Sequence, residues 1–168
     1  MENRKFWTPV RTKPRQEKKL ARYCTAKNIP FYLPLIHKAH YYGKKKADFS
    51  SPMFPGYVFC RINEDLFSTL QYSNAVVYKI GIDSSTEREL VRELKAIRVF
   101  ERMSDKHVIE ICPELVAGTP IEISRGVFRG ISGIVQCRKN KMMLIVNIEL
   151  LGQTAAVEIN VADVEKRG

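Results

Sequence analysis

Residues 54–62 read Phe54-Pro55-Gly56-Tyr57-Val58-Phe59-Cys60-Arg61-Ile62, and this stretch joins a special backbone turn to an aromatic strand. Pro55 fixes φ, and Gly56 can take the positive φ that the next position of a type II turn requires. From Tyr57 onward the side chains alternate, which predicts a half-buried strand with Val58 and Cys60 facing the core. The other face carries two aromatic rings beside an arginine. It is either covered by a helix or offered to a partner.

The excess positive charge lies in one part of the chain. Residues 1–50 contain 13 Lys/Arg and 3 Asp/Glu, a net charge of +10, whereas residues 51–168 contain 15 of each. This asymmetry favours a polyanionic partner, nucleic acid before membrane, over a merely solvated face. The sequence has no run of about 18 apolar residues that could span a bilayer and no signal-peptide core at its start. We therefore expect a cytoplasmic protein without membrane contact.

The first 36 residues predict a strand, a helix and a second strand. The apolar run at 6–10 is the first strand, and Pro9 restricts it to a sheet edge or a bulge. A helix is expected to begin after Thr12, because a proline follows within its first turn, and to end at Asn28. Residues 31–36 then predict the second strand.

Residues 37–52 predict a projecting loop or hairpin with its tip at Gly43. Its lysines are interleaved with tyrosines and with Phe49, and this mixture is typical of nucleic-acid contacts, because cations hold phosphates and rings stack on unpaired bases. His37 and His40 have no third metal ligand nearby, so they predict polar loop residues. We expect neither a metal site nor another cofactor.

Residues 63–103 predict two helices separated by a strand. A short helix is expected at 66–70, a strand at 76–81, and a longer helix that begins at a capping box, Thr86 to Glu89, and runs to Met103. Strands and helices alternate through residues 5–103, which predicts an α/β sandwich of one sheet with packed helices.

From Ser104 the sequence changes to short β runs separated by turns. Runs at 120–124, 132–137, 142–149, 154–159 and 161–164 predict a small SH3-like barrel. The predicted fold class is therefore α+β, with domains at 1–105 and 118–168 and a linker at 106–117. Within that linker, 108–112 could add a strand to the first domain.

The four cysteines are far apart in the sequence and form no Cys-x-x-Cys pair. Without that pairing, they predict reduced, semi-buried thiols rather than a disulfide framework or a zinc site. These residues are Cys24, Cys60, Cys112 and Cys137.

Residues 119–135 predict a strand, a glycine-bearing loop and a second strand, and they resemble the KOW motif of RNA- and ribosome-associated proteins. The motif residues are Gly126, Phe128, Gly130 and Gly133. A Trp-containing first strand, Arg11–Glu17 and Phe54–Phe59 precede it, in the order found in the NusG/RfaH family of transcription elongation factors. The resemblance covers nearly the whole chain, and its long basic arm favours a specialised paralogue over the housekeeping factor.

The resemblance implies a NusG-type N-terminal domain that binds the clamp helices of bacterial RNA polymerase, holds the clamp closed and reduces pausing. It places that contact at Trp7, Phe54, Tyr57, Phe59 and Ile80. Large aromatic side chains carry much of the energy of protein interfaces, so these residues suit the role. Ser68 and Thr69 fall where RfaH-like members carry a polar motif facing the polymerase gate loop, although those members begin it with a histidine.

The resemblance also implies contact with upstream or non-template DNA or with nascent RNA. The residues expected there are Lys13, Arg15, Lys19, His40, Tyr41, Tyr42, Lys44, Lys45 and Lys46. Phosphate contacts supply affinity, and base contacts supply sequence choice.

KOW domains of this family recruit partners, typically a small-subunit ribosomal protein or the terminator Rho. Housekeeping members carry an Ile-Phe-Gly element between the third and fourth strands of this domain, where this chain has Ile148–Gln153. The departure puts Rho binding in doubt. We therefore expect a monomeric antitermination factor.

The sequence does not predict an enzyme. It has three histidines, no serine nucleophile elbow and no glycine loop that could hold a phosphate. A ribosome-associated RNA-binding protein remains the alternative, because a KOW barrel and a basic arm would serve ribosomal RNA equally well. The two functions differ in whether the protein co-purifies with RNA polymerase or co-sediments with ribosomal subunits.

Overall fold

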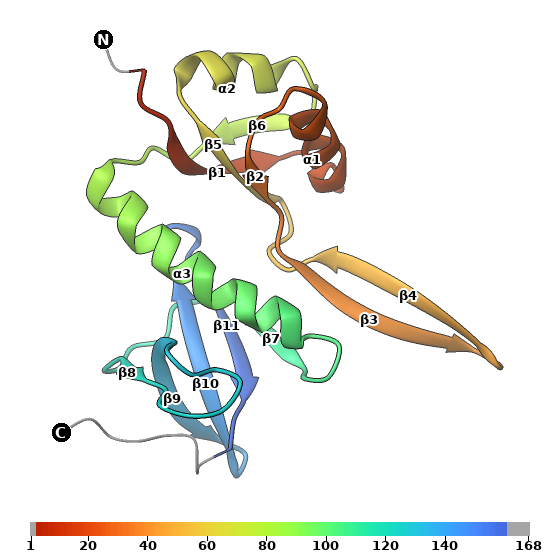
Figure 1. The fold of residues 1–168 in the computed structure, drawn as a ribbon, viewed down its shortest axis with the longest axis vertical. Coiled ribbons are helices and arrows are strands. Elements are labelled where there is room, and N and C mark those ends of the chain that lie inside the picture. Colours follow the sequence, from red (N-terminus) through yellow and green to blue (C-terminus); the bar gives the residue numbers. More distant parts are fainter. Residues whose placement is uncertain (1–2, 161–168) are drawn as a thin grey trace. The chain divides into compact units, whose positions relative to one another are not determined.

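The computed structural model describes residues 3–160. This part of the chain forms three α-helices and eleven β-strands, which are labelled in Figure 1, and a short 3-10 turn. The chain divides into two compact units, which are described separately. The first contains the residues up to Leu35 and Ser51–Val91, and the second contains Ile36–Ser50 and the residues from Arg92 onward. None of the helices in residues 3–160 has the length and apolar character needed to cross a membrane.

The first unit is built on a four-stranded antiparallel sheet in the order β2 (Phe31–Tyr32), β5 (Tyr57–Ile62), β1 (Phe6–Thr12), β6 (Val76–Lys79). Strand β1 is therefore central, so of the two predicted alternatives the sheet edge is wrong; the pairing of β1 with β6 does contain a register shift, between Arg11 and Thr12. The sheet tolerates this proline because pairing with β6 ends beside it. There the Ile80 N–H donates to the Pro9 carbonyl at 2.9 Å, and the bond that the missing Pro9 N–H cannot return falls just beyond the end of β6.

Helices α1 (Glu17–Ala26) and α2 (Glu64–Gln71) pack on one face of this sheet. Their buried side chains, Leu20, Cys24 and Leu70, meet Val58 and Cys60 of β5. The core-facing set predicted from the alternation in β5 is thus confirmed. Burial of each large apolar side chain here stabilises the folded state by roughly 1.5–3 kcal/mol. This packing fixes the orientation of β5, so that its other face is directed away from α1 and α2.

Helix α1 begins later than expected. The chain turns at Arg15, which has φ of +62°, and the helix starts at Glu17 rather than after Thr12. The predicted end is confirmed. Asn28 adopts φ of +56°, and the Ile29 N–H donates to the Cys24 carbonyl at 2.9 Å, closing the last turn.

Helix α3 (Ser84–Met103) begins earlier than the predicted capping box. Asp83 caps it, because its Oδ1 accepts hydrogen bonds from both the backbone N–H and the hydroxyl of Thr86, each at 2.8 Å. These bonds, first of all the one from the backbone, lower the pKa of Asp83. An ionised carboxylate is a stronger acceptor for helix N–H groups than a threonine hydroxyl, so Asp83 takes the cap.

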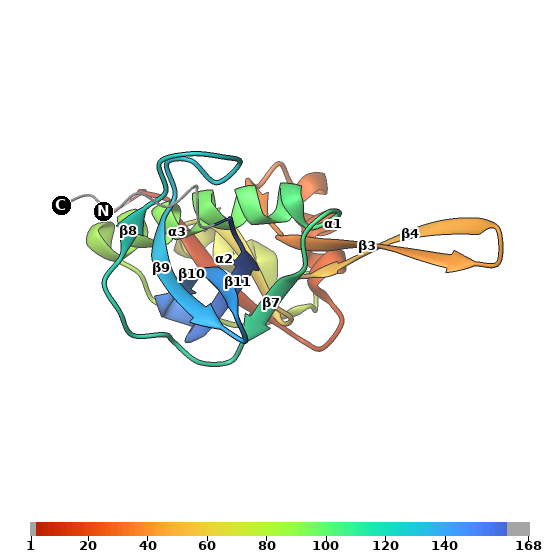
Figure 2. The same ribbon diagram turned by 90° about the horizontal axis from the view of Figure 1, so that it is seen from below.

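The predicted hairpin is confirmed as β3 (Leu35–Tyr42) and β4 (Lys45–Pro52), with Gly43 in the turn at φ of +63°. Figures 1 and 2 show its two strands side by side. The strand predicted at 31–36 is split instead, because β2 ends at Tyr32 and β3 begins after Pro34. At its base the His37 N–H donates to the Ser104 hydroxyl at 3.1 Å.

The second unit contains a five-stranded antiparallel sheet in the order β7 (Ile109–Cys112), β11 (Gln153–Glu158), β10 (Lys141–Ile148), β9 (Ser132–Arg138), β8 (Ile121–Glu122). The 3-10 turn Glu149–Leu151 joins β10 to β11. Figure 2 shows the strands side by side. The strand expected at 161–164 lies outside the described residues, and closure of the sheet into a barrel stays a prediction.

Residues of the expected linker are ordered against this sheet. Strand β7 pairs with β11, so 108–112 does not add a strand to the first sheet. Further along, the Asn147 side chain exchanges two hydrogen bonds with the backbone of Val116, at 2.8 and 3.0 Å. These paired backbone groups hold the segment in place. The domain boundaries at 105 and 118 remain a prediction.

Candidate functional site

The turn before β5 is held by the Arg11–Glu17 segment. Gly56 has the predicted positive φ, +89°, and its N–H donates to the buried carboxylate of Glu17 at 2.9 Å. Its carbonyl accepts the Thr12 N–H at 2.8 Å. A Cβ at this position would lie 2.4 Å from Nη1 of Arg11. Two stretches about 40 residues apart therefore form one structural unit, which sets the direction of β5.

Three side chains from three strands gather on the sheet face opposite α1 and α2. The register places Arg11 of β1 between Tyr57 of β5 and Tyr78 of β6, and opposed residues point to the same side of a sheet. The guanidinium carbon of Arg11 lies 4.9 Å from the centre of the Tyr57 ring, a cation–π distance. Burial, followed by a hydrogen bond to Tyr78, raises the pKa of Tyr57.

Most of the predicted clamp contact belongs to the same face. Strand alternation puts Phe59 and Arg61 on the same face as Tyr57, and Trp7 is paired with Arg61, so Trp7 shares that face. Ile80 lies next to Pro9, the partner of Phe59, and donates its N–H to the Pro9 carbonyl, so it belongs to the same face. Phe54 precedes the turn. Trp7, Tyr57 and Ile80 are half-buried, whereas Phe54 and Phe59 are 1% and 0% exposed. A partner would reach the half-buried group and not the two phenylalanines.

The sequence prediction did not include two residues that stand out on this face, Arg11 and Tyr78. Tyr78 is 47% exposed, and Arg11 lies over the ring of Tyr57. Their proximity follows from the pairing of β1 with β6, which leaves no local signal in the sequence. In the sequence, Arg11 is marked only as the first residue of the Arg11–Glu17 segment that carries part of the family resemblance.

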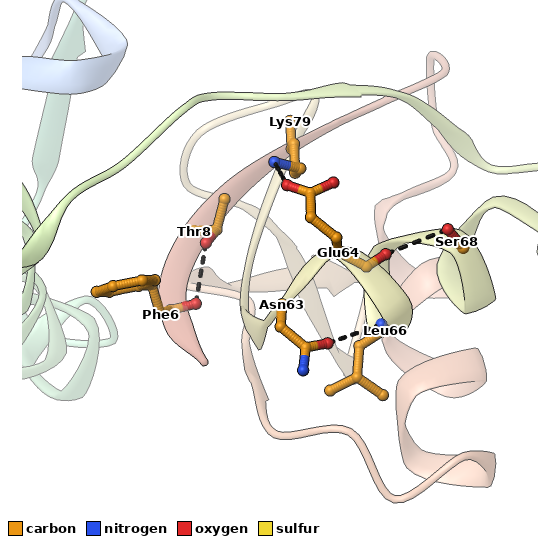
Figure 3. A network of polar contacts seen from close by, with 7 residues as sticks. All are labelled: Phe6, Thr8, Asn63, Glu64, Leu66, Ser68 and Lys79. Atoms are coloured by element: carbon orange, nitrogen blue, oxygen red, sulfur yellow. Dashed lines mark hydrogen bonds and ion pairs between the residues drawn. The ribbon is translucent and has the colours of Figure 1, made fainter. Parts of the chain in front are cut away.

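The expected gate-loop residues lie on α2, beside the polar network in Figure 3. Ser68 Oγ donates to the Glu64 carbonyl at 3.1 Å, and Thr69 Oγ1 donates to the Asp65 carbonyl at 3.2 Å. Both hydroxyl protons are thus used inside the helix, and the two side chains offer a partner only acceptor lone pairs.

The start of α2 is fixed by the same network. Asn63 Oδ1 accepts the Leu66 N–H at 2.9 Å, and Lys79 Nζ lies 2.7 Å from Glu64 Oε1. Helix α2 is therefore anchored both at its cap and across to β6. A groove of about 250 Å³ beside it is lined in part by Phe6 and Lys79.

Cys24 and Cys60, distant in sequence, meet in the first core with their sulfur atoms 3.9 Å apart. The hydrogen bond between them lowers the pKa of Cys24 and raises that of Cys60 well above its usual value. Among the side chains that the structure describes, which do not include that of His40, no three His, Cys, Asp or Glu residues form a group that could hold a metal ion.

The residues expected at nucleic acid are divided between the two units. Lys13, Arg15 and Lys19 are exposed in the first unit, while Lys44, Lys45 and Lys46 are exposed at the hairpin tip in the second. Tyr41 and Tyr42 are 71% and 66% exposed. His40 lies on β3, but its side chain is outside the part of the chain that the structure describes.

The residues of the predicted KOW motif lie in the loop between β8 and β9 and at the start of β9. Gly126 and Gly130 have φ of +81° and +86°, and a Cβ on Gly133 would lie 2.7 Å from the Ile145 carbonyl oxygen. Phe128 is buried and packs edge-on against Phe100 of α3, with ring centres 5.5 Å apart. It is a packing residue in this structure rather than an exposed contact.

The family model described as "Transcription termination factor nusG" matches residues 5–117, more than half of the 168-residue chain. The chain therefore belongs to the NusG family. A solved structure titled "Domain interaction in Thermotoga maritima NusG" is 17% identical, covers 98% of both chains and has a TM-score of 0.49. No curated protein matches the chain significantly.

Proposed function

We propose that this NusG-family protein is a transcription elongation and antitermination factor that binds the clamp helices of RNA polymerase through the half-buried residues on the Tyr57 face of its first sheet. The family implies a role with RNA polymerase. The observation that carries the proposal is the set of half-buried aromatic residues on this face, held by the buried bond from Gly56 to Glu17. Prepositioned aromatic side chains lose little conformational entropy when they bind.

The proposed contact includes Trp7, Tyr57 and Ile80, with Arg11 and Tyr78 added from the structure. Arg11 supplies a cation beside the rings, so the complementary polymerase surface combines apolar side chains with carboxylates. Phe54 and Phe59 are buried and are therefore left out of the proposed contact. Ser68 and Thr69 accept hydrogen bonds from the gate loop in this proposal.

The basic hairpin contacts nucleic acid near the bound polymerase. This nucleic acid is upstream DNA, non-template DNA or nascent RNA. Its lysines provide phosphate contacts and its exposed tyrosines provide stacking surfaces. Lys13, Arg15 and Lys19 contribute further phosphate contacts from the first unit.

The C-terminal KOW domain recruits a partner, and a small-subunit ribosomal protein fits the family pattern. The segment that replaces the Ile-Phe-Gly element forms the turn Glu149–Leu151, where the Glu149 N–H donates to Glu93 of α3 at 3.4 Å. Its sequence differs from the element linked to Rho. We therefore infer antitermination rather than support of termination, although the family model carries the name of a termination factor.

Single-round transcription through a pause site and a Rho-dependent terminator tests this function. Wild-type protein should shorten the pause and increase readthrough, and Tyr57→Ala should lose most of both effects. Tyr72→Ala is the control, because Tyr72 is 81% exposed and lies beyond α2. Equal activity of Tyr57→Ala and wild type would contradict the proposed face. If the protein neither affects transcription nor binds polymerase, the ribosome-associated alternative takes its place.

A further inference from the structure

The second unit contains a groove of about 880 Å³ between the base of the hairpin and the end of α3. Lys38, Lys46 and Phe49 of the hairpin line one side, and Arg102 and Lys106 line the other. The bond from His37 N–H to Ser104 Oγ, at 3.1 Å, joins the two sides at the base. The groove is therefore formed by segments more than 50 residues apart, and only its hairpin side is suggested by the sequence.

Four of these groove residues are cations, and they can follow a phosphate backbone. Lys46 lies 3.9 Å from Asp48, but both side chains are more than half exposed. Such surface pairs are worth little and exchange readily for a stronger anion. Phosphate groups of a nucleic-acid strand can therefore replace this contact.

Phe49 makes the groove suitable for unpaired bases. Its ring is 48% exposed among the cations, and an aromatic ring in a basic groove is the usual platform for a base of a single strand. A duplex keeps its bases stacked inside and cannot use such a ring, so the groove favours single-stranded nucleic acid.

Carboxylates in the groove distinguish RNA from DNA. Asp48, Glu101 and Asp105 also line it beside the four cations, and these carboxylates repel phosphates unless the ligand brings hydrogen-bond donors. Every ribose carries a 2′-hydroxyl, which can donate to a carboxylate, whereas deoxyribose has none. We propose that this groove binds single-stranded RNA, with Phe49 stacking on a base, the cations on phosphates and the two aspartates on 2′-hydroxyls. This proposal rests on the nucleic-acid contact proposed above and selects RNA for it.

Fluorescence anisotropy of the full chain with a labelled, unstructured RNA of about 12 nucleotides tests the proposal. DNA of the same sequence and an RNA duplex serve as comparison probes, each titrated from about 50 to about 200 mM salt. Single-stranded RNA should bind about fivefold more tightly than the DNA, the effect of one to two hydrogen bonds. Asp48→Asn/Asp105→Asn should reduce this preference. Equal or tighter binding of DNA or of the duplex overturns the proposal.

Two matched pairs of variants test the groove itself. Phe49→Leu should weaken RNA binding at least about fivefold, whereas Tyr72→Leu, in the first unit, should not. Arg102→Ala/Lys106→Ala should make the slope of log affinity against log salt shallower by about 1.4. Lys95→Ala/Arg98→Ala removes the same charge from exposed positions of α3 that do not line the groove, so it should leave the slope unchanged. The proposal is overturned if Phe49→Leu weakens RNA binding no more than Tyr72→Leu. It is also overturned if the two double variants of α3 change the salt slope equally.

The test separates the groove from the proposed function. If only substitutions of Lys44 and Lys45, which do not line the groove, weaken RNA binding, the groove proposal fails and the contact at the hairpin tip stands. If wild-type protein binds none of the probes at about 50 mM salt, both nucleic-acid proposals fail. The polymerase contact is judged independently by Tyr57→Ala, which lies outside the groove and should bind RNA like wild type.

Discussion

The turn at Gly56 and the hairpin tip at Gly43 use similar residues in opposite ways. Both combine a positive-φ glycine with tyrosines and basic side chains. At Gly56 the backbone is bonded to buried Glu17 and the Tyr57 ring is covered by Arg11. At Gly43 a Cβ would meet nothing within 4 Å. The first region is prepositioned for a fixed partner surface, and the second is open for an adaptable contact with nucleic acid.

Replacing each glycine with alanine measures this difference and should give the largest effect. Gly56→Ala meets a left-handed φ and the Arg11 guanidinium at 2.4 Å, and should lower the free energy of unfolding by about 3 kcal/mol. Gly43→Ala meets only the backbone penalty, so it should cost no more than about 1 kcal/mol. Urea unfolding followed by fluorescence of Trp7, the single tryptophan, measures both. Similar losses would show that the two turns are equally constrained.

The next effect concerns the buried acceptor of the Gly56 N–H. Glu17→Ala leaves that donor unsatisfied and should lower the free energy of unfolding by about 2 kcal/mol. Glu17→Gln keeps an acceptor oxygen of the same length and should cost less than about 1 kcal/mol. The same urea titration measures both. If alanine proved as mild as glutamine, the bond from Gly56 to Glu17 would not hold the turn.

The fold could be predicted from the sequence where local patterns decide the structure. The alternation from Tyr57 to Ile62 identified the buried face of β5, and the hairpin followed from Gly43 and the lysine run. The contact of Glu17 with Gly56 could not be predicted, because it depends on tertiary packing across 39 residues. The N-cap of α3 was predicted at Thr86, but Asp83, three residues earlier, is also a good capping residue and is the cap in the structure. The strand expected at 108–112 is present as β7, but it was assigned to the wrong sheet because its pairing partner, β11, lies more than 40 residues later.

The candidate site was predicted in the same uneven way. One face of β5 and its aromatic residues followed from period-two alternation, but burial of Phe54 and Phe59 did not. Arg11 and Tyr78 join the site only through the register of β1 with its two neighbours. A site distributed over three strands has no spacing that a single sequence can reveal.

A smaller effect on stability is expected at the hairpin. Replacing Lys44, Lys45 and Lys46 together with alanine should change the free energy of unfolding by no more than about 0.5 kcal/mol, because all three are exposed. The same variant should make the salt dependence of single-strand binding shallower by about 2 in slope. Urea unfolding and anisotropy titrations measure the two quantities. A marked loss of stability would mean that the hairpin is not the open region described above.

The smallest effect is a pH dependence at Tyr57. Its pKa is raised by burial and by the hydrogen bond to Tyr78, so the folded state favours the neutral phenol. The contribution of neutral Tyr57 to the free energy of unfolding is fully present below the usual tyrosine pKa of about 10. It is lost as pH rises through the higher pKa that Tyr57 has in the folded protein. Absorbance of the phenolate should show one late-titrating tyrosine that is missing in Tyr57→Phe. An unchanged titration curve in that variant would contradict the packing of Arg11, Tyr57 and Tyr78.

Direct binding to purified RNA polymerase tests the central claim, that the polymerase contact lies on the sheet face that carries Tyr57. We would measure the affinity of Tyr57→Ala, Tyr78→Ala and the control Tyr72→Ala, each with an unchanged circular dichroism spectrum. Loss of an interface aromatic costs about 2 kcal/mol, or about thirtyfold in affinity. We expect that loss for Tyr57→Ala, a smaller one for Tyr78→Ala, and wild-type affinity for Tyr72→Ala. Wild-type affinity in all three variants would contradict the account.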